Sequence, residues 1–157
     1  MQIIFWKQTL MTLDNKLHSS WWALRIVIGL AAFLAGLDKF FNILVNWSMY
    51  LSPFTQHVLP IDGNVFLRLI GIIEMIVGLA ILTRWTRIGA YIASAWWLLI
   101  AVNLVIGGFF DVAVRDIEIS IAAFVLARMT EARQPEAVAE RAPEARFRSD
   151  SSQAAKP

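Results

Sequence analysis

The sequence contains no cysteine and only two histidines among its 157 residues. It therefore has no means of forming a disulfide, a thiolate nucleophile, a cysteine-bound zinc site or an iron–sulfur cluster. His18 precedes the first apolar stretch and His57 follows it, so we expect these residues on opposite sides of a membrane, unable to hold one haem. We expect no covalently bound cofactor and no metal ligand set. Any redox chemistry must rely on a bound organic molecule or a partner subunit to carry the electrons.

Charge is also scarce. Charged residues make up 17% of the sequence and hydrophobic residues 58%, which is far from the composition of an average soluble domain. The formal net charge is only +2, and no long basic run is present that could follow a phosphate backbone. We therefore expect a lipid bilayer, and not a nucleic acid, as the main partner.

Four stretches are predicted to be membrane-spanning helices, namely residues 21–45, 65–83, 88–106 and 112–128. The third carries no charge over nineteen residues and would extend roughly 30 Å as a helix, the thickness of a bilayer core. The fourth is weaker because Arg115, Asp116 and Glu118 crowd its first turns. Each such charge costs about 2.5 to 3.5 kcal/mol at a helix centre, so we expect this helix to insert only when packed. The fold class predicted is an all-α, four-helix transmembrane bundle.

The basic residues alternate between the connecting segments. Residues 1–20 hold two, 46–64 none, 84–87 two, 107–111 none, and the segment after Ala127 six. Under the positive-inside rule, both termini and the 84–87 turn are predicted to be cytoplasmic, and the other two connections face outward.

The two ends of the chain differ from the middle. Apolar residues in 1–20 recur at alternating spacings of three and four, which predicts an interfacial amphipathic helix on the inner leaflet. Residues 130–157 are rich in Ala, Glu, Arg, Gln, Pro and Ser with few large apolar side chains, which predicts a disordered cytoplasmic tail. The membrane domain is thus predicted to be residues 21–129.

Several ionisable or polar residues fall within the predicted spans. The helix directions place Glu74 near the bilayer midplane and the others in the outer half: Asp38, Lys39, Arg68, Asn103, Arg115, Asp116 and Glu118. Together with Glu74, these residues include three positive and four negative groups, so mutual pairing is possible. Small residues share a helix face with Glu74 and another with Lys39, as expected of packed faces. We predict a polar pocket between the helices that opens outward, with Glu74 at its floor.

Each of these residues also has a purely structural interpretation. Asp38, Lys39 and Arg68 can serve as interfacial anchors and bundle-stabilising ion pairs. Arg115 can pair with Glu118, three residues further along the same helix. Glu74 is different, since a lone carboxyl near the bilayer centre is a functional candidate by default, here as a proton exchanger.

The tryptophans fall into two groups. Trp97, together with Trp96, lies at the depth of Glu74, where it either packs or brings an indole N–H to the carboxyl. The remaining tryptophans near the span ends fit interfacial belts, namely Trp21, Trp22, Trp47 and Trp85.

A set of motifs follows in order: Arg25-x3-Gly29-Leu30-x2-Phe33-Leu34-x-Gly36-x2-Lys39-Phe40, then Glu74-x3-Gly78-Leu79-Ala80-Ile81-Leu82-Thr83-Arg84, then Arg115-Asp116. This pattern resembles the DoxX-like family of small bacterial integral membrane proteins over roughly residues 22–129. The resemblance implies a four-helix bundle in the inner membrane. Some members are subunits of thiosulfate:quinone oxidoreductases or associate with oxidative-stress and thiol-redox systems. The absence of cysteine argues against any mechanism that uses the chain's own thiols.

The leading hypothesis is an accessory or quinone-interacting subunit of a redox or respiratory assembly, not an enzyme on its own. Glu74 is its candidate proton exchanger, and the ligand-binding candidates are Asp38, Lys39, Arg68, Trp97, Asn103, Arg115 and Asp116. The alternative is a non-catalytic membrane assembly or scaffold protein whose charges only lock the bundle. A small-solute permease is less favoured, because four spans show neither broken helices nor inverted repeats.

Overall fold

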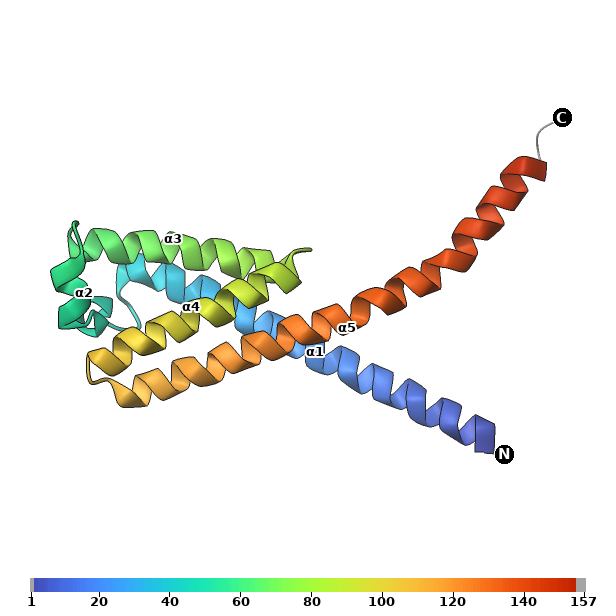
Figure 1. The fold of residues 1–157 in the computed structure, drawn as a ribbon, viewed down its shortest axis with the longest axis horizontal. Coiled ribbons are helices and arrows are strands. Elements are labelled where there is room, and N and C mark those ends of the chain that lie inside the picture. The colour runs from blue at the N-terminus through green and yellow to red at the C-terminus, as the bar shows by residue number, and fades with distance from the viewer. Residues whose placement is uncertain (1, 155–157) are drawn as a thin grey trace.

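The computed structural model describes the backbone of residues 2–154 and the side chains of residues 16–133. Within this range the chain is helical, with no strand (Figure 1). The elements are α1 (Gln2–Phe41), the short 3-10 helix η1 (Trp47–Tyr50), α2 (Pro53–Val58), α3 (Gly63–Leu82), α4 (Thr86–Ile106) and α5 (Phe110–Ala154). The prediction of an all-α chain is confirmed for these residues.

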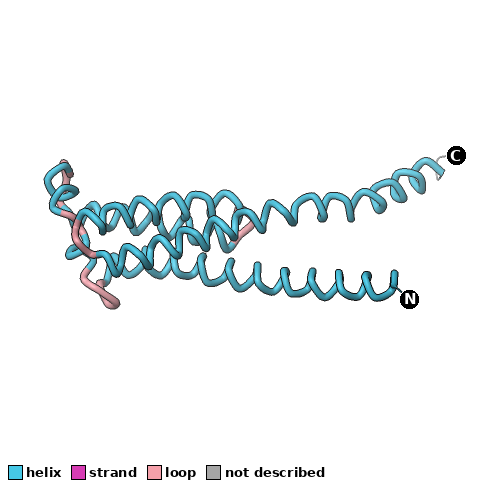
Figure 2. Tube along the Cα trace, turned by 60° about the horizontal axis from the view of Figure 1, so that its bottom comes forward, coloured by secondary structure: helices cyan, strands magenta, loops and turns pink. Residues whose placement is uncertain are grey.

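The long helices α1, α3, α4 and α5 lie alongside one another, with α1 packed on α3 and α4 packed on α5 (Figures 1 and 2). The short helices η1 and α2 lie at one end of this arrangement, together with the connection between α4 and α5. The turn between α3 and α4 lies at the other end. The N-terminal part of α1 and the C-terminal part of α5 extend beyond that same end. Both termini therefore emerge on the side of the Arg84–Arg87 turn.

Three helical segments are long and apolar enough to cross a membrane by length and composition, within the part of the chain that the structure describes. They are Lys16–Phe41, Gly63–Leu82 and Thr86–Ile106. These segments correspond to the first three predicted spans. The fourth, at the start of α5, does not meet the same criterion, in keeping with the charges in its first turns. Its crossing of the membrane stays a prediction.

The N-terminal region differs from the prediction of a separate interfacial helix at residues 1–20. From Gln2 onward this region is continuous with the first span in the single 40-residue helix α1, and Met1 lies outside the described residues. Ser19 and Ser20 stand where a new helix could have been capped. Instead, both hydroxyls donate to the carbonyl of Lys16, at 2.9 and 3.0 Å, a bond pattern that leaves the helix intact.

Helix α1 ends at Phe41, four residues before the predicted limit of 45. Asn42 has a φ of 49°, the left-handed conformation that commonly ends helices, and its amide N–H bonds to the Asp38 carbonyl at 2.7 Å. The Asp38 carboxylate accepts the next two amide N–H groups, from Ile43 and Leu44. Asp38 therefore closes the helix end and turns the chain.

Helix α5 extends to Ala154, within the segment 130–157 for which a disordered tail is predicted, and that prediction stays untested. Residues 155–157 lie outside the described residues. Scarce large apolar residues argue against a packed core but not against a helix. Alanine, glutamate, arginine and glutamine have high helix propensity, but Pro135 and Pro143 also lie in this segment and proline disfavours a helix interior, so composition alone does not account for the helical backbone.

Bulky apolar side chains cover the outside of the long helices, for example Val27, Ile76, Leu99 and Ile121, all more than half exposed. The interior contains smaller residues and a core cluster that includes Ile81, Ala93, Trp97 and Leu126. This distribution is the reverse of that in a soluble protein and matches a chain whose exterior faces lipid.

Candidate functional site

A buried ion pair joins the first two candidate spans. The Lys39 ammonium on α1 lies 2.5 Å from a carboxylate oxygen of Glu74 on α3. The two side chains are only 5% and 4% exposed. Breaking such a pair would leave an uncompensated charge in an apolar interior, so each partner compensates the charge of the other.

Glycines on both helices bring these two residues together. A Cβ atom built on Gly36 would lie 2.5 Å from the carbonyl oxygen of Gly71, and the reverse substitution meets the same obstacle. A second contact of this kind, about two helical turns away, pairs Gly29 with Gly78. Only glycine permits this separation, as in other close-packed membrane helices. Because the two helices are antiparallel, Glu74 lies beside Gly36 and Lys39 lies beside Gly71, and the long lysine side chain reaches across this contact to the carboxylate. The predicted packed faces are thus seen in contact.

A third helix contributes Asp116. Its side chain is buried on α5, and it interacts electrostatically with both Lys39 and Glu74. Arg115 donates to one Asp116 oxygen from two nitrogens, at 3.0 and 2.9 Å, while the rest of its side chain is about half exposed. The structure therefore pairs Arg115 with its neighbour Asp116 and leaves Glu118 exposed, unlike the alternative pairing of Arg115 with Glu118.

Trp47 completes the surroundings of Lys39. The ammonium lies 3.8 Å from the centroid of a Trp47 ring, within range of a cation–π interaction. The Trp47 indole N–H donates to Asp38 at 2.8 Å. A continuous chain of contacts thus runs from Glu74 through Lys39 and Trp47 to Asp38. Sequence reasoning assigned Trp47 only to an interfacial belt, because no spacing rule predicts that the turn after α1 folds back over Lys39.

Of the two central tryptophans, Trp96 is the one that faces Glu74. The Trp96 indole interacts with the Glu74 carboxyl, although its buried N–H finds no partner within hydrogen-bond geometry among the described residues. Trp97 is buried in the apolar core cluster instead. One residue along a helix is a turn of about 100°, so the pair divides between the polar and apolar sides.

A pocket of about 130 Å³ adjoins the ion pair at the end of the helices nearest η1 and α2. Its lining includes Lys39, Asn42, Asn64 and Arg68, all able to donate hydrogen bonds. Arg68 is exposed and reaches this pocket without joining the ion pair. Of the residues predicted for the polar pocket, Lys39 and Arg68 line this one, and Glu74 does not.

Asn103 lies apart from this cluster. Its side-chain oxygen accepts from the Ser52 amide at 3.2 Å and from the Thr55 hydroxyl at 2.7 Å, and its nitrogen donates to the Tyr50 carbonyl at 2.7 Å. These three bonds fasten the segment between α1 and α3 onto α4. The structure thus gives Asn103 a role in holding the connection over the end of the helices.

The described residues contain no group of three or more His, Cys, Asp and Glu side chains that could hold a metal ion.

The fold and site so far define an all-helical membrane protein with an ion pair buried between its helices. The model of the DoxX family matches residues 20–107, more than half of the chain, and the protein belongs to the DoxX family. No curated protein and no solved structure matches it.

Proposed function

We propose that this DoxX protein is an accessory subunit of a membrane redox assembly, in which the Lys39–Glu74 pair and Asp116 exchange a proton with a quinone-type headgroup. The observation that carries the proposal is the buried ion pair directly beside a pocket lined with hydrogen-bond donors. In the same proposal, α5 is the fourth span, the protein lies in the bacterial inner membrane, and both termini are cytoplasmic. The common end of the termini and the Arg84–Arg87 turn supports this topology.

The charges of the cluster suit proton exchange. Two buried carboxyl groups, Glu74 and Asp116, share one buried ammonium, that of Lys39. Arg115 offsets part of the excess from a half-exposed position. A carboxylate without a full counter-charge in a low-dielectric interior is stabilised by taking up a proton. The cluster can therefore hold a proton between α1, α3 and α5 and release it.

The donor set of the pocket fits a quinone headgroup, whose carbonyl oxygens accept hydrogen bonds. Lys39, Arg68 and the side-chain amides of Asn42 and Asn64 would hold those oxygens. A volume of about 130 Å³ is below the usual range for a whole ligand, so the pocket admits a ring and not a long tail. The tail would lie outside, along exposed apolar side chains such as Phe41.

Quinone reduction consumes two electrons and two protons. The chain has no cysteine and two histidines, so the electrons are assigned to a partner subunit. Lys39 orients the headgroup, and Glu74 supplies one of the two protons through its contact with Lys39, while the second proton is assigned, like the electrons, to the partner subunit.

The test uses the assembly purified in mild detergent from its native membrane, with co-purifying subunits and extractable quinone identified first. Glu74→Gln keeps the shape of the side chain but removes the exchangeable proton. We expect quinol-dependent turnover per assembly to fall at least about 100-fold. Glu118→Gln, an exposed carboxyl on α5, is the matched control and should leave turnover unchanged. Full turnover with Glu74→Gln would refute the proposal.

The direct contact in the ion pair favours a second candidate function, that of a non-catalytic assembly subunit. Lys39 and Glu74 satisfy each other at 2.5 Å, at the point where α1 and α3 approach most closely. In this case the pair only fixes the register of the two helices. Glu74→Gln would then lower the yield or melting temperature of the assembly while turnover per assembly stays unchanged.

A further inference from the structure

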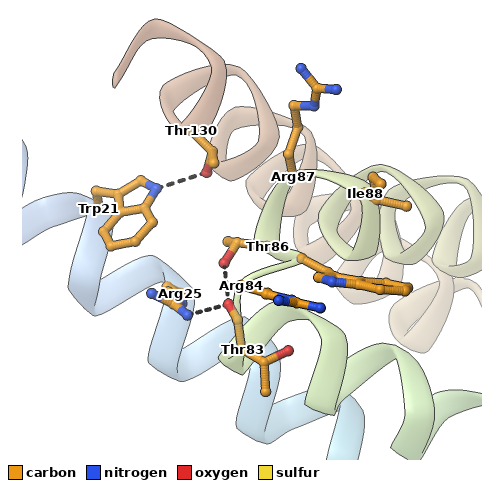
Figure 3. A pocket seen from close by; sticks show the side chains of 9 residues that line it. Trp21, Arg25, Thr83, Arg84, Thr86, Arg87, Ile88 and Thr130 are labelled. Atoms are coloured by element: carbon orange, nitrogen blue, oxygen red, sulfur yellow. Dashed lines mark hydrogen bonds between the residues drawn. The ribbon is translucent and has the colours of Figure 1, made fainter. Parts of the chain in front are cut away.

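A second cavity lies at the opposite end of the helices from the ion pair, around the turn between α3 and α4. Its volume is about 350 Å³. Figure 3 shows Trp21 and Arg25 reaching it from α1, Thr130 from α5, and the turn residues Thr83 and Thr86 from below. Residues of α1, of α5 and of the start of α4 thus line it, and it stays partly open. Its size is within the range of small-molecule sites.

Three arginines line this cavity and no carboxylate does. Arg25 is already engaged, since it donates to the carbonyls of Ile81, Leu82 and Thr83 at the end of α3. Arg84 is exposed and makes no hydrogen bond or ion pair with the described part of the chain. Arg87 lines the cavity from the first turn of α4. The cavity therefore presents one arginine fork, that of Arg84, which is not used within the described part of the fold.

The structural role of Arg25 makes the cavity rigid. Its guanidinium lies 5.0 Å from the centroid of a Trp21 ring and 4.8 Å from that of a Trp22 ring. The Trp21 indole N–H donates to the Thr130 hydroxyl at 2.8 Å, which ties α1 to α5. The Thr86 hydroxyl donates back to the carbonyls of Ile81 and Thr83, at 2.8 and 3.0 Å. The walls are thus held by bonds of the protein itself, and a ligand need not order them.

The flank of the cavity is apolar. Trp85 and Ile88 both line it, and their side chains are 57% and 53% exposed. They stand at the junction of two candidate spans, α3 and α4, where a membrane surface meets water. Tryptophan is typical of this depth. A ligand here meets cations at one end and lipid chains at the other.

We propose that this cavity binds the phosphate headgroup of an anionic glycerophospholipid, with Arg84 holding the phosphate oxygens. Arginine presents paired N–H donors that match a phosphate group. Basic pockets between membrane helices on the cytoplasmic side suit such headgroups. The acyl chains lie along Trp85 and Ile88. This site is separate from the Lys39–Glu74 cluster and does not depend on the function proposed for it.

The test measures lipid binding to the full chain in detergent by native mass spectrometry, with phosphatidylglycerol, phosphatidylcholine or inorganic phosphate added. We expect phosphatidylglycerol to bind at least tenfold more tightly than phosphatidylcholine. Arg84→Gln should weaken phosphatidylglycerol binding about tenfold, as expected for a lost charged hydrogen bond. Arg84→Lys keeps the charge but removes the paired N–H donors of the guanidinium, so a smaller loss of binding is expected. This variant replaces Arg84→Gln in the test if the glutamine variant folds poorly.

Arg128→Gln is the matched control, since Arg128 is an exposed arginine on α5 that does not line the cavity. It should change binding less than twofold. Competition by inorganic phosphate would support the shared phosphate chemistry and make a free phosphate a second ligand. Its absence assigns the site to the lipid. Equal weakening by Arg128→Gln, or no weakening by either Arg84 variant, would overturn the proposal.

Discussion

Removing one partner of the buried ion pair should destabilise the protein far more than removing both. Lys39→Met leaves the Glu74 carboxylate buried without its counter-charge, and Glu74→Leu does the same to the ammonium. Each side chain is at most 5% exposed, so water can offer little compensation. Breaking a buried pair in this way costs about 3 to 5 kcal/mol, whereas replacing both partners by apolar residues of similar volume is often neutral. We therefore expect the double variant to be within about 1 kcal/mol of the wild type.

The assay is unfolding in mixed micelles with an increasing fraction of denaturing detergent, followed by tryptophan fluorescence and combined in a double-mutant cycle. If the two effects were independent, the double variant would lose at least about 6 kcal/mol, the sum of the smallest single losses. Arg128 and Glu131 are the control pair, because their side chains are 64% and 31% exposed. Their cycle should show a coupling of less than about 1 kcal/mol. Additive losses at Lys39 and Glu74 would refute the argument that each residue is needed mainly to neutralise the other.

Three further substitutions test the contacts around the two sites. Gly71→Ala forces a Cβ against the Gly36 carbonyl and should destabilise the protein by about 1 to 3 kcal/mol in the same unfolding assay. Gly63→Ala is the control and should have little effect, because its Cβ meets only the flexible Leu51 side chain. Arg25→Gln removes the cation from the end of α3 and should cost about 1.5 to 3 kcal/mol, and an unchanged midpoint would contradict the capping role. Asn103→Leu frees the connection between α1 and α3, so limited proteolysis should cut residues 46–62 faster than in the wild type, and equal rates would show that other contacts suffice.

The sequence was most informative where a helix face must exclude lipid. The three uncharged or nearly uncharged runs are the helices that can cross a membrane. The small residues in step with Lys39 and Glu74 identified the faces on which α1 and α3 meet. Both inferences follow from the period of the helix, which relates sequence spacing to direction in space. They did not require knowledge of which helix packs on which.

Contacts made by side chains across turns were beyond sequence reasoning. Trp47 covers Lys39 only because Asn42 adopts a left-handed conformation and the chain folds back, and Asn is one of several residues that could do so. By sequence spacing, Arg115 could pair with either Asp116 or Glu118. Its side-chain rotamer determines that it pairs with Asp116. The continuity of α1 depended on whether two serines capped a new helix or bonded back to the old one. Composition does not distinguish these outcomes.

The contacts between α1 and α3 belong to one antiparallel register. Gly36 meets Gly71, and seven residues earlier on α1, Gly29 meets Gly78, seven residues later on α3. The same register brings Arg25 level with the Leu82 carbonyl, and it places Lys39 and Glu74 on either side of the Gly36–Gly71 contact, where the lysine side chain reaches the carboxylate. A slip of one helical turn would remove both sets of charged contacts and press side chains against backbone at both glycine pairs. The cavity at the α3–α4 turn and the ion pair therefore depend on the same helix packing, and a change that shifts α1 along α3 should disturb both.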